Sequence, residues 1–226
     1  MKNIIKDACI LFAITLVAGI LLGLVYNVTK DPIAQQNEKA KQKAYQEVIA
    51  DADKFEALDG SYASDKVAET AKAVLSASAT DFSKDDVSEV VAGIKNGKII
   101  GFVVTVVAHD GYGGDIQITV GIMSDGTVNG ISFLSISETA GLGMRAKEPS
   151  FYNQFAGQQA EKFYVSKDGG DIDAITASTI TSRAFLNAVN AAYQAFKGNT
   201  GDAASGASVQ AGRVENATGT GSDSIH

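Results

Sequence analysis

The first part of the chain contains one uninterrupted apolar run. From Ala8 to Val28 it reads ACILFAITLVAGILLGLVYNV, 21 residues without a charge. An α-helix of that length rises by roughly 30 Å, which matches the hydrocarbon core of a bilayer. A cleaved signal peptide is the alternative, but its apolar region is usually about 7–15 residues long and ends at a small-x-small site, which is absent here. The pattern therefore predicts a membrane helix, with Tyr26 at the interface.

Helical periodicity continues after the apolar run, but now one face is polar. Asp31-Pro32 suits a helix start, and apolar residues then recur at helical spacing. We expect a helical stalk over residues 31–50. Residues 51–88 are polar and weakly periodic, and they predict only a short helix near 66–77.

From Glu89 the apolar positions alternate instead. The segment EVVAGIKNGKIIGFVVTVVA has two β-rich runs that meet at Asn96-Gly97, a dipeptide that suits a type I′ hairpin turn. A second pair of β-rich runs meets at Asp125-Gly126, and its first run places large apolar residues at every other position. Two consecutive hairpins imply an antiparallel sheet.

Two more helices are expected, at 150–164 and from Ile180 to Lys197. In the second, large apolar residues recur at i, i+3, i+7 and i+10 and would pack on the sheet; they are Leu186, Val189, Tyr193 and Phe196. We predict an α+β fold, in which an antiparallel sheet of hairpins is packed by helices and preceded by one transmembrane helix. The expected parts are a membrane anchor (1–30), a helical stalk (31–50), one domain (51–197) and a disordered tail rich in Gly, Ala, Ser and Thr (198–226).

Composition excludes several kinds of redox centre. The chain has one cysteine, Cys9, and two histidines, His109 and His226. One thiol can form no internal disulfide, cysteine-ligated iron–sulfur cluster or Cys-x-x-Cys-His haem attachment. Two histidines are too few for a histidine-rich zinc or copper site, and the carboxylates are scattered along the chain, so no metal site is expected. Any redox chemistry would therefore depend on an organic cofactor.

The charge pattern narrows the partners but not the orientation. With 26 acidic and 19 basic residues the formal charge is −7, which argues against nucleic-acid binding. Lysines flank both ends of the apolar run, so the positive-inside rule does not decide which side the domain occupies. No nucleophile–base pair is visible, and His109 reads as a histidine at a strand end.

Three short segments combine glycine with hydroxyl or aromatic residues. Residues 109–114 hold three glycines and Tyr112, and residues 137–144 (SETAGLGM) form a loop able to present backbone N–H groups. Taken singly, each could be an ordinary connection between elements. Residues 173–182 (DAITASTITS) place five hydroxyl side chains at the start of the last helix. A helix N-terminus favours phosphate, and one cap needs only one such residue.

These segments resemble a known family. Asp173-x-x-Thr176-Ala177-Ser178-Thr179 is similar to the flavinylation motif Asp-x-x-Ser/Thr-Gly-Ala-Thr, whose last threonine carries FMN through a phosphoester bond. Residues 138–143 (ETAGLG) resemble the Glu-Thr-Pro-Gly-Leu-Gly loop of the same FMN-binding domain, and the Gly-Tyr-Gly-Gly turn at 111–114 also fits. Where the motifs differ, a small residue replaces a small one, so the tight turn should survive.

The resemblance extends over residues 1–197 and includes the segment that leaves the apolar run, a Tyr-x-x-Thr-x-x-Pro-Ile pattern at 26–33. It is greatest to the G-subunit family of the ion-translocating Rnf ferredoxin:NAD oxidoreductase complex. The C subunit of the sodium-translocating NADH:quinone reductase is a close relative and remains an alternative, as does a membrane-tethered binding or structural domain without flavin.

The resemblance implies a membrane-anchored electron carrier in the cell membrane, with an extracytoplasmic domain and covalent FMN on Thr179. An external flavin transferase would attach the FMN, with Thr181 as the alternative acceptor, and the other Rnf subunits would be the partners. The resemblance also implies a set of residues around the cofactor: Thr176 and Ser178 near the phosphate, Glu138, Thr139 and Leu142 at the ring or ribityl chain, and Gly141, Gly143 and Tyr112 in the adjoining turns.

Overall fold

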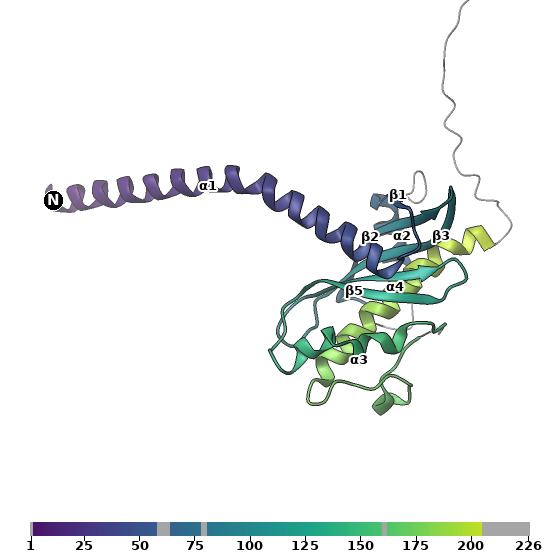
Figure 1. The fold of residues 1–226 in the computed structure, drawn as a ribbon. Helices are drawn as coiled ribbons and strands as arrows, with labels where there is room; N and C mark the ends of the chain where they lie inside the picture. The colour runs from purple at the N-terminus through teal and green to yellow at the C-terminus, as the bar shows by residue number, and fades with distance from the viewer. Residues whose placement is uncertain (1, 58–63, 78–80, 160–161, 205–226) are drawn as a thin grey trace, which may run out of the picture.

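The computed structural model describes residues 2–57, 64–77, 81–159 and 162–204 (Figure 1). In chain order the elements are α1 (Lys2–Val48), β1 (Lys54–Ala57), α2 (Ser64–Ala77), β2 (Asp85–Lys95), β3 (Lys98–Ala108), β4 (Ile116–Met123), β5 (Val128–Ile136), the 3-10 helix η2 (Gly143–Lys147), α3 (Pro149–Tyr152), the 3-10 helices η3 (Asn153–Phe155) and η4 (Ser166–Asp168), and α4 (Thr179–Ala204). The strands form one sheet in the order β1-β2-β3-β4-β5, with every neighbouring pair antiparallel. The predicted α+β class is confirmed.

Both predicted hairpins are present. Asn96 and Gly97 join β2 to β3 with φ angles of 51° and 72°, the two positive values that a type I′ turn needs. Gly126, with φ 88°, closes the turn between β4 and β5. The four-residue strand β1 was not predicted. It lies in the weakly periodic stretch and pairs with β2 at the edge of the sheet.

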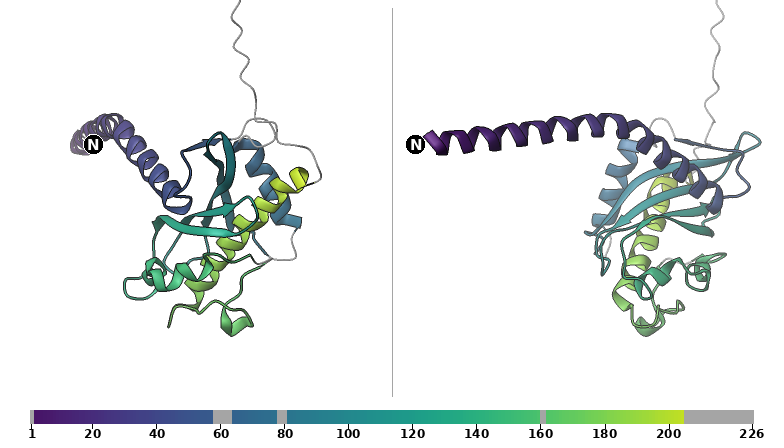
Figure 2. Two further views of the ribbon diagram at one scale, coloured as in Figure 1. Left: turned by 45° about the vertical axis from the view of Figure 1, so that its right-hand side comes forward. Right: turned by 60° about the vertical axis from the view of Figure 1, so that its left-hand side comes forward.

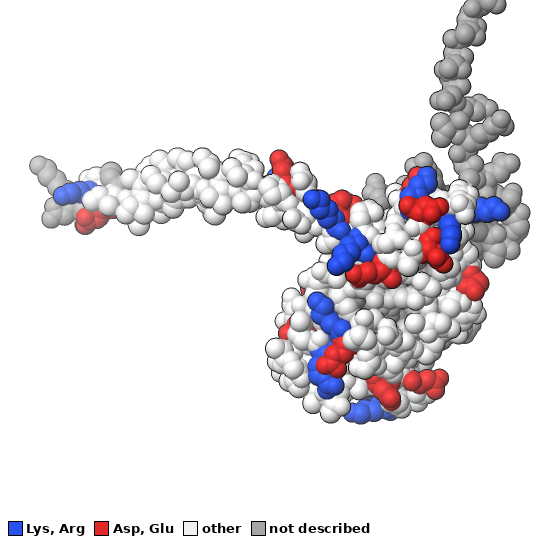
Figure 3. Space-filling model, viewed as in Figure 1, with Lys and Arg blue, Asp and Glu red and all other residues white. Residues whose placement is uncertain are grey.

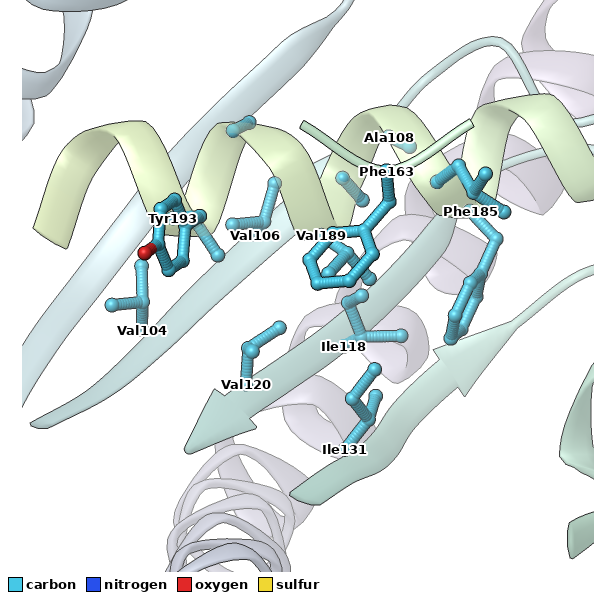
Figure 4. Close-up of a cluster of buried hydrophobic side chains, with 14 of the residues drawn as sticks. Val104, Val106, Ala108, Ile118, Val120, Ile131, Phe163, Phe185, Val189 and Tyr193 are labelled. Carbon is cyan, nitrogen blue, oxygen red and sulfur yellow. The ribbon is translucent and has the colours of Figure 1, made fainter. Parts of the chain in front are cut away.

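The main core lies between the sheet and α4. Figure 4 shows α4 lying across β3 and β4, with its apolar side chains pointing into the strands. The four predicted core residues of this helix, Leu186, Val189, Tyr193 and Phe196, are all buried. They meet the apolar residues that alternate along β4, which are fully buried, namely Ile116, Ile118, Val120 and Ile122. The predicted packing of this helix on the sheet is therefore confirmed.

The end of α1 covers the opposite face of the sheet (Figures 1 and 2). Tyr45, Val48 and Ile49 are almost fully buried and pack in a second apolar cluster with residues of β2 and β3. Glycine makes the approach possible, because a Cβ on Gly121 would lie 2.6 Å from the Val48 carbonyl oxygen. Glu89 adds polar contacts with α1, accepting from the Tyr45 hydroxyl at 2.9 Å and from a lysine ammonium. The last turns of the predicted stalk thus belong to the core of the domain.

The first half of α1 projects away from the domain. In the described part of the chain it is the one helix long and apolar enough to cross a membrane, and none of its apolar window is buried. Figure 3 shows this stretch as a shaft almost without charged side chains. Anchor and stalk form one continuous helix with Pro32 inside it, and Figure 1 shows α1 bending between its two halves, as an internal proline favours.

Two predicted boundaries differ from the structure. The helix expected over 150–164 is only the short pair α3 and η3, which ends at Phe155. Gly157 follows with φ 77°, a left-handed conformation that cannot continue a right-handed helix. The last helix runs to Ala204, past the expected start of the tail at 198, whereas residues 205–226 lie outside the described chain.

Candidate functional site

The three glycine- and hydroxyl-rich segments meet at one end of the domain. They line a cavity of about 420 Å³, a size suited to a small organic ligand. The loop between β3 and β4 supplies one wall, the loop after β5 a second, and the start of α4 the third. The lining residues are Tyr112, Glu138, Thr139, Leu142, Gly143, Ala177, Ser178, Thr179, Ile180 and Thr181.

The Glu138 carboxylate joins all three walls. Its Oε1 accepts from the Tyr112 backbone N–H at 2.8 Å and from the Thr181 hydroxyl at 3.0 Å, while Oε2 accepts from the Gly113 N–H at 3.2 Å. Gly143 is required beside it, because a Cβ at that position would overlap the carboxylate. The sequence predicted Glu138 as a flavin contact. In the structure its oxygens hold the loops together and fix the shape of the cavity.

The floor of the cavity is the N-terminus of α4, which begins at Thr179. The first N–H groups of a helix have no partner within it, and the helix dipole gives this end a partial positive charge. The Ser178 side chain lies beside them, 7% exposed, with a hydroxyl oxygen that has no hydrogen-bond partner. Among the described residues that line the cavity there is no lysine or arginine. The floor therefore offers polar donors without a full positive charge.

The two candidate acceptor hydroxyls differ sharply in environment. Thr179 is half-buried and lines the cavity as the first residue of α4. Thr181 is 1% exposed, and its hydroxyl already donates to Glu138. Of the two residues, Thr179 is the more exposed.

The mouth of the cavity is apolar. Tyr112, Leu142 and Ile180 are 70%, 41% and 54% exposed. Outside α1, Tyr164 is the only other large apolar side chain that is exposed in the described chain. Three of these four side chains thus gather at one cavity, where a flat ring system could cover them.

Most predicted site residues line this cavity, but Thr176 and Gly141 do not. Thr176 lines a smaller cavity of about 120 Å³ together with Arg145 and Gln154. Gly141 has φ 75° and shapes the turn in the loop after β5. Ala177 and Ile180 were not predicted as lining residues. Their position in the sequence could have indicated it, because both lie within two residues of Thr179 at the start of the helix.

His109 lies outside the cavity and is held by acids on both sides. Its Nδ1 is 3.0 Å from Asp115 Oδ1 and its Nε2 is 3.1 Å from Asp86 Oδ2. These hydrogen bonds, to Asp115 and then Asp86, raise the pKa of the imidazole. The contacts favour the interpretation of a structural histidine over that of a general base.

Ala177 has an unusual backbone for its residue type. Its φ of 62° lies in the left-handed region, where a Cβ costs roughly 1–2 kcal/mol and glycine costs little. The flavinylation motif has glycine at this position. We expect Ala177→Gly to raise the free energy of unfolding by about 1 kcal/mol, measured by urea unfolding of the full chain in detergent with circular dichroism.

The matched control for that change is Ala140→Gly. Ala140 is also exposed in a cavity loop but lacks a positive φ. Glycine there should only add freedom to the unfolded chain and leave stability unchanged or lower. Equal stabilisation by both changes would contradict strain at Ala177.

Comparison with known proteins defines the class first. Residues 111–194, which include all three cavity walls, match the model of the FMN-binding domain. Residues 1–48, which include all of α1, match the RnfG N-terminal region. The chain thus combines an FMN-binding domain with an N-terminal helix that could span a membrane.

Curated relatives then give the family. The chain is 34% identical to the G subunit of the Na⁺-translocating ferredoxin:NAD⁺ oxidoreductase complex of Acetobacterium woodii, over 87% of this chain and 93% of that protein. It is 30% identical to the G subunit of the proton-translocating complex of Clostridium ljungdahlii, over 84% and 93%, and 30% identical to the G subunit of the ion-translocating oxidoreductase complex of Shewanella baltica, over 88% and 92%. The chain belongs to this family of G subunits, which confirms the predicted resemblance.

Proposed function

We propose that this chain is the electron-carrying G subunit of a membrane-bound, ion-translocating ferredoxin:NAD oxidoreductase, and that its FMN is esterified to Thr179. One observation carries the proposal. Thr179 lies at the N-terminus of α4 and lines a cavity that falls within the FMN-binding domain. Membership of the family of G subunits supports the assignment to this complex, and the position of Thr179 supports it as the attachment point.

The donors on the cavity floor fit a phosphate of low charge. A phosphate monoester carries nearly two charges near neutral pH, and cationic side chains usually balance them. Here the lining has no lysine or arginine and includes the Glu138 carboxylate. A diester has one charge, which the N–H groups of α4 and the unpartnered Ser178 hydroxyl can accommodate. This balance favours an esterified FMN over a freely dissociating one.

The attachment is a group transfer that the chain does not catalyse itself. A bond forms between Thr179 Oγ and the phosphorus of the FMN group, and the P–O bond of an activated, anhydride-linked FMN donor breaks, so that the rest of the donor leaves as a phosphate. The hydroxyl proton leaves to a base of the external flavin transferase. Among the cavity-lining residues no histidine or lysine can serve as that base, and an unactivated threonine is a poor nucleophile.

The protein residues position the cofactor and shield it. The FMN supplies the transfer of single electrons. Tyr112, Leu142 and Ile180 would cover the apolar edge of the ring and keep water from it, while Thr139 and the backbone of the loop after β5 would contact its polar edge. The end of α1 packs on the sheet and fixes the position of this domain relative to the membrane helix. A fixed position suits an electron carrier that must meet its partners at a constant distance from the membrane.

The location follows from the same proposal. The domain lies on the extracytoplasmic side, where a dissociating cofactor would be lost and a covalent bond retains it. Other subunits of the complex exchange electrons with it and contact the exposed faces of α1 in the bilayer. The relatives are subunits of such a complex, and the N-terminal helix has the length and composition of a membrane span.

The decisive experiment is the intact mass of the full chain, produced with and without a flavin transferase of the same family. We expect an added mass of one FMN less one water, with yellow colour, only when the transferase is active. A membrane-tethered domain without flavin predicts an unmodified, colourless chain in both cases. That result beside an active transferase, verified on a known substrate, would overturn the proposal.

A further inference from the structure

A second polar site lies outside the cavity, where β2 begins and β3 ends. Asp85 is the first residue of β2, and Asp110 follows the last residue of β3 by two positions. The backbone N–H of His109 donates to the backbone carbonyl of Lys84 at 2.8 Å and holds these two chain segments side by side. The sequence showed only scattered acids, 25 positions apart, and the antiparallel pairing of β2 with β3 brings them together.

The carboxylate of Asp85 is buried, and no residue of the described chain donates a hydrogen bond to it. The residue is 6% exposed, and both of its Oδ atoms are buried and lack a hydrogen-bond partner. One Oδ atom of Asp110 is buried and unpartnered as well. Buried polar atoms almost always have partners, and a bare buried charge is costly. Three buried carboxylate oxygens thus lack any hydrogen bond from the described chain that would offset the free-energy cost of burying them.

The surrounding charges increase that cost. Burial, and then repulsion from Asp110, raise the pKa of Asp85 to about 7. Asp81 and Asp86 also raise the pKa of Asp85, and within the described chain His109 is the only group that lowers it. The imidazole of His109 is already engaged on both nitrogens, with Asp86 and Asp115. No donor or cation of the described chain therefore serves the three bare oxygens.

A proton could satisfy only part of this cluster. One shared proton joins two oxygens in a single hydrogen bond and leaves the third buried oxygen bare. A metal ion can instead take oxygens from more than one carboxylate, and hard cations of the calcium class prefer carboxylate and water oxygens, taking six to eight of them. No three or more His, Cys, Asp or Glu side chains of the described chain form a metal centre alone, so backbone or water oxygens would complete the shell.

We propose that Asp85 and Asp110 bind one divalent cation of the calcium class between the start of β2 and the loop from β3 to β4. The bound ion neutralises both carboxylates and ties that loop, which carries Tyr112, to the sheet. With two carboxylates, the expected dissociation constant is about 10⁻⁴–10⁻³ M, the range of calcium-binding extracellular modules. The site is independent of the flavin, so it can be tested on unmodified chain.

The test is equilibrium dialysis of the chelator-treated full chain in detergent against radioactive Ca²⁺. Wild type should bind one Ca²⁺ per chain, and its thermal unfolding midpoint should rise with CaCl₂. Asp85→Asn and Asp110→Asn should each weaken binding at least about tenfold and remove the rise. The matched control is Asp51→Asn, which removes an exposed acid paired with Lys95 at the other end of β2 and should bind as wild type does.

Two further readings make the test decisive. Asp85→Asn removes a bare buried charge, so this variant should unfold at no lower temperature than wild type in chelator, and its binding defect then reflects the site and not misfolding. Failure of wild type to bind Ca²⁺ saturably at millimolar concentration would overturn the proposal. So would a midpoint that rises on acidification in chelator but is unchanged by Ca²⁺ at neutral pH, because the cluster would then hold a proton only.

Discussion

Thr179→Ala is expected to yield a chain without covalent flavin, even when it is produced beside an active flavin transferase. The variant lacks the hydroxyl of Thr179, the half-buried residue that begins α4 and lines the cavity. The loss should be complete, because a missing nucleophile leaves no bond to form. Intact mass and the visible absorption of the purified chain measure it directly.

The matched control for this variant is Thr181→Val. Thr181 is a threonine two positions along the same helix, but its side chain is buried and donates to Glu138. Valine keeps its shape and removes the hydroxyl, so the FMN adduct should persist with some loss of yield. An adduct that survives in Thr179→Ala and disappears in Thr181→Val would move the attachment to Thr181 and refute the present assignment.

Much of the fold could be predicted because its signals are local. Asn96-Gly97 fixes a hairpin by the conformations that those two residues tolerate, and the observed φ angles are both positive. The spacing of Val189 and Tyr193 on α4 gives the face that meets the sheet, and both are buried. A turn or a helix face of this kind can be predicted without knowing which distant residues it contacts.

The elements that were missed depend on distant partners. β1 has only four residues and becomes a strand because β2 offers it an edge. The docking of Val48 on the sheet relies on Gly121, which is far away in sequence and appears in the pattern only as a break in an apolar strand. Short or isolated signals of this kind acquire meaning only when the strands are assembled.

The candidate site shows the same division. Thr179 and the loop at 137–144 were identified because short motifs preserve the local backbone of a family. The bridging geometry of Glu138 could not be predicted, since its hydrogen-bond partners include residues 25 and 43 positions away. The bare pair of Asp85 and Asp110 was missed for the same reason, because dispersed acids have no sequence pattern.

Glu138→Ala is expected to reduce flavin loading at least about tenfold and to lower the free energy of unfolding by about 2 kcal/mol. The carboxylate accepts from Tyr112, Gly113 and Thr181, so its removal releases two loops and the start of α4 from one another. Water can reach the two loop amides, which limits the cost in stability. The loss of order affects mainly the cavity, where the proposed attachment requires the Thr179 hydroxyl in one position.

Two variants separate this bridging role from the effect of charge alone. Glu138→Gln keeps one acceptor oxygen, so flavin loading should fall between that of alanine and wild type. Glu148→Ala removes an exposed carboxylate that pairs only with Arg145 near the adjoining small cavity, and loading should stay at the wild-type level. Intact mass gives the loaded fraction, and urea unfolding gives the stability of each chain. Full loading of Glu138→Ala would show that the three walls keep their positions without the carboxylate, and equal losses in Glu138→Ala and Glu148→Ala would point to surface charge instead.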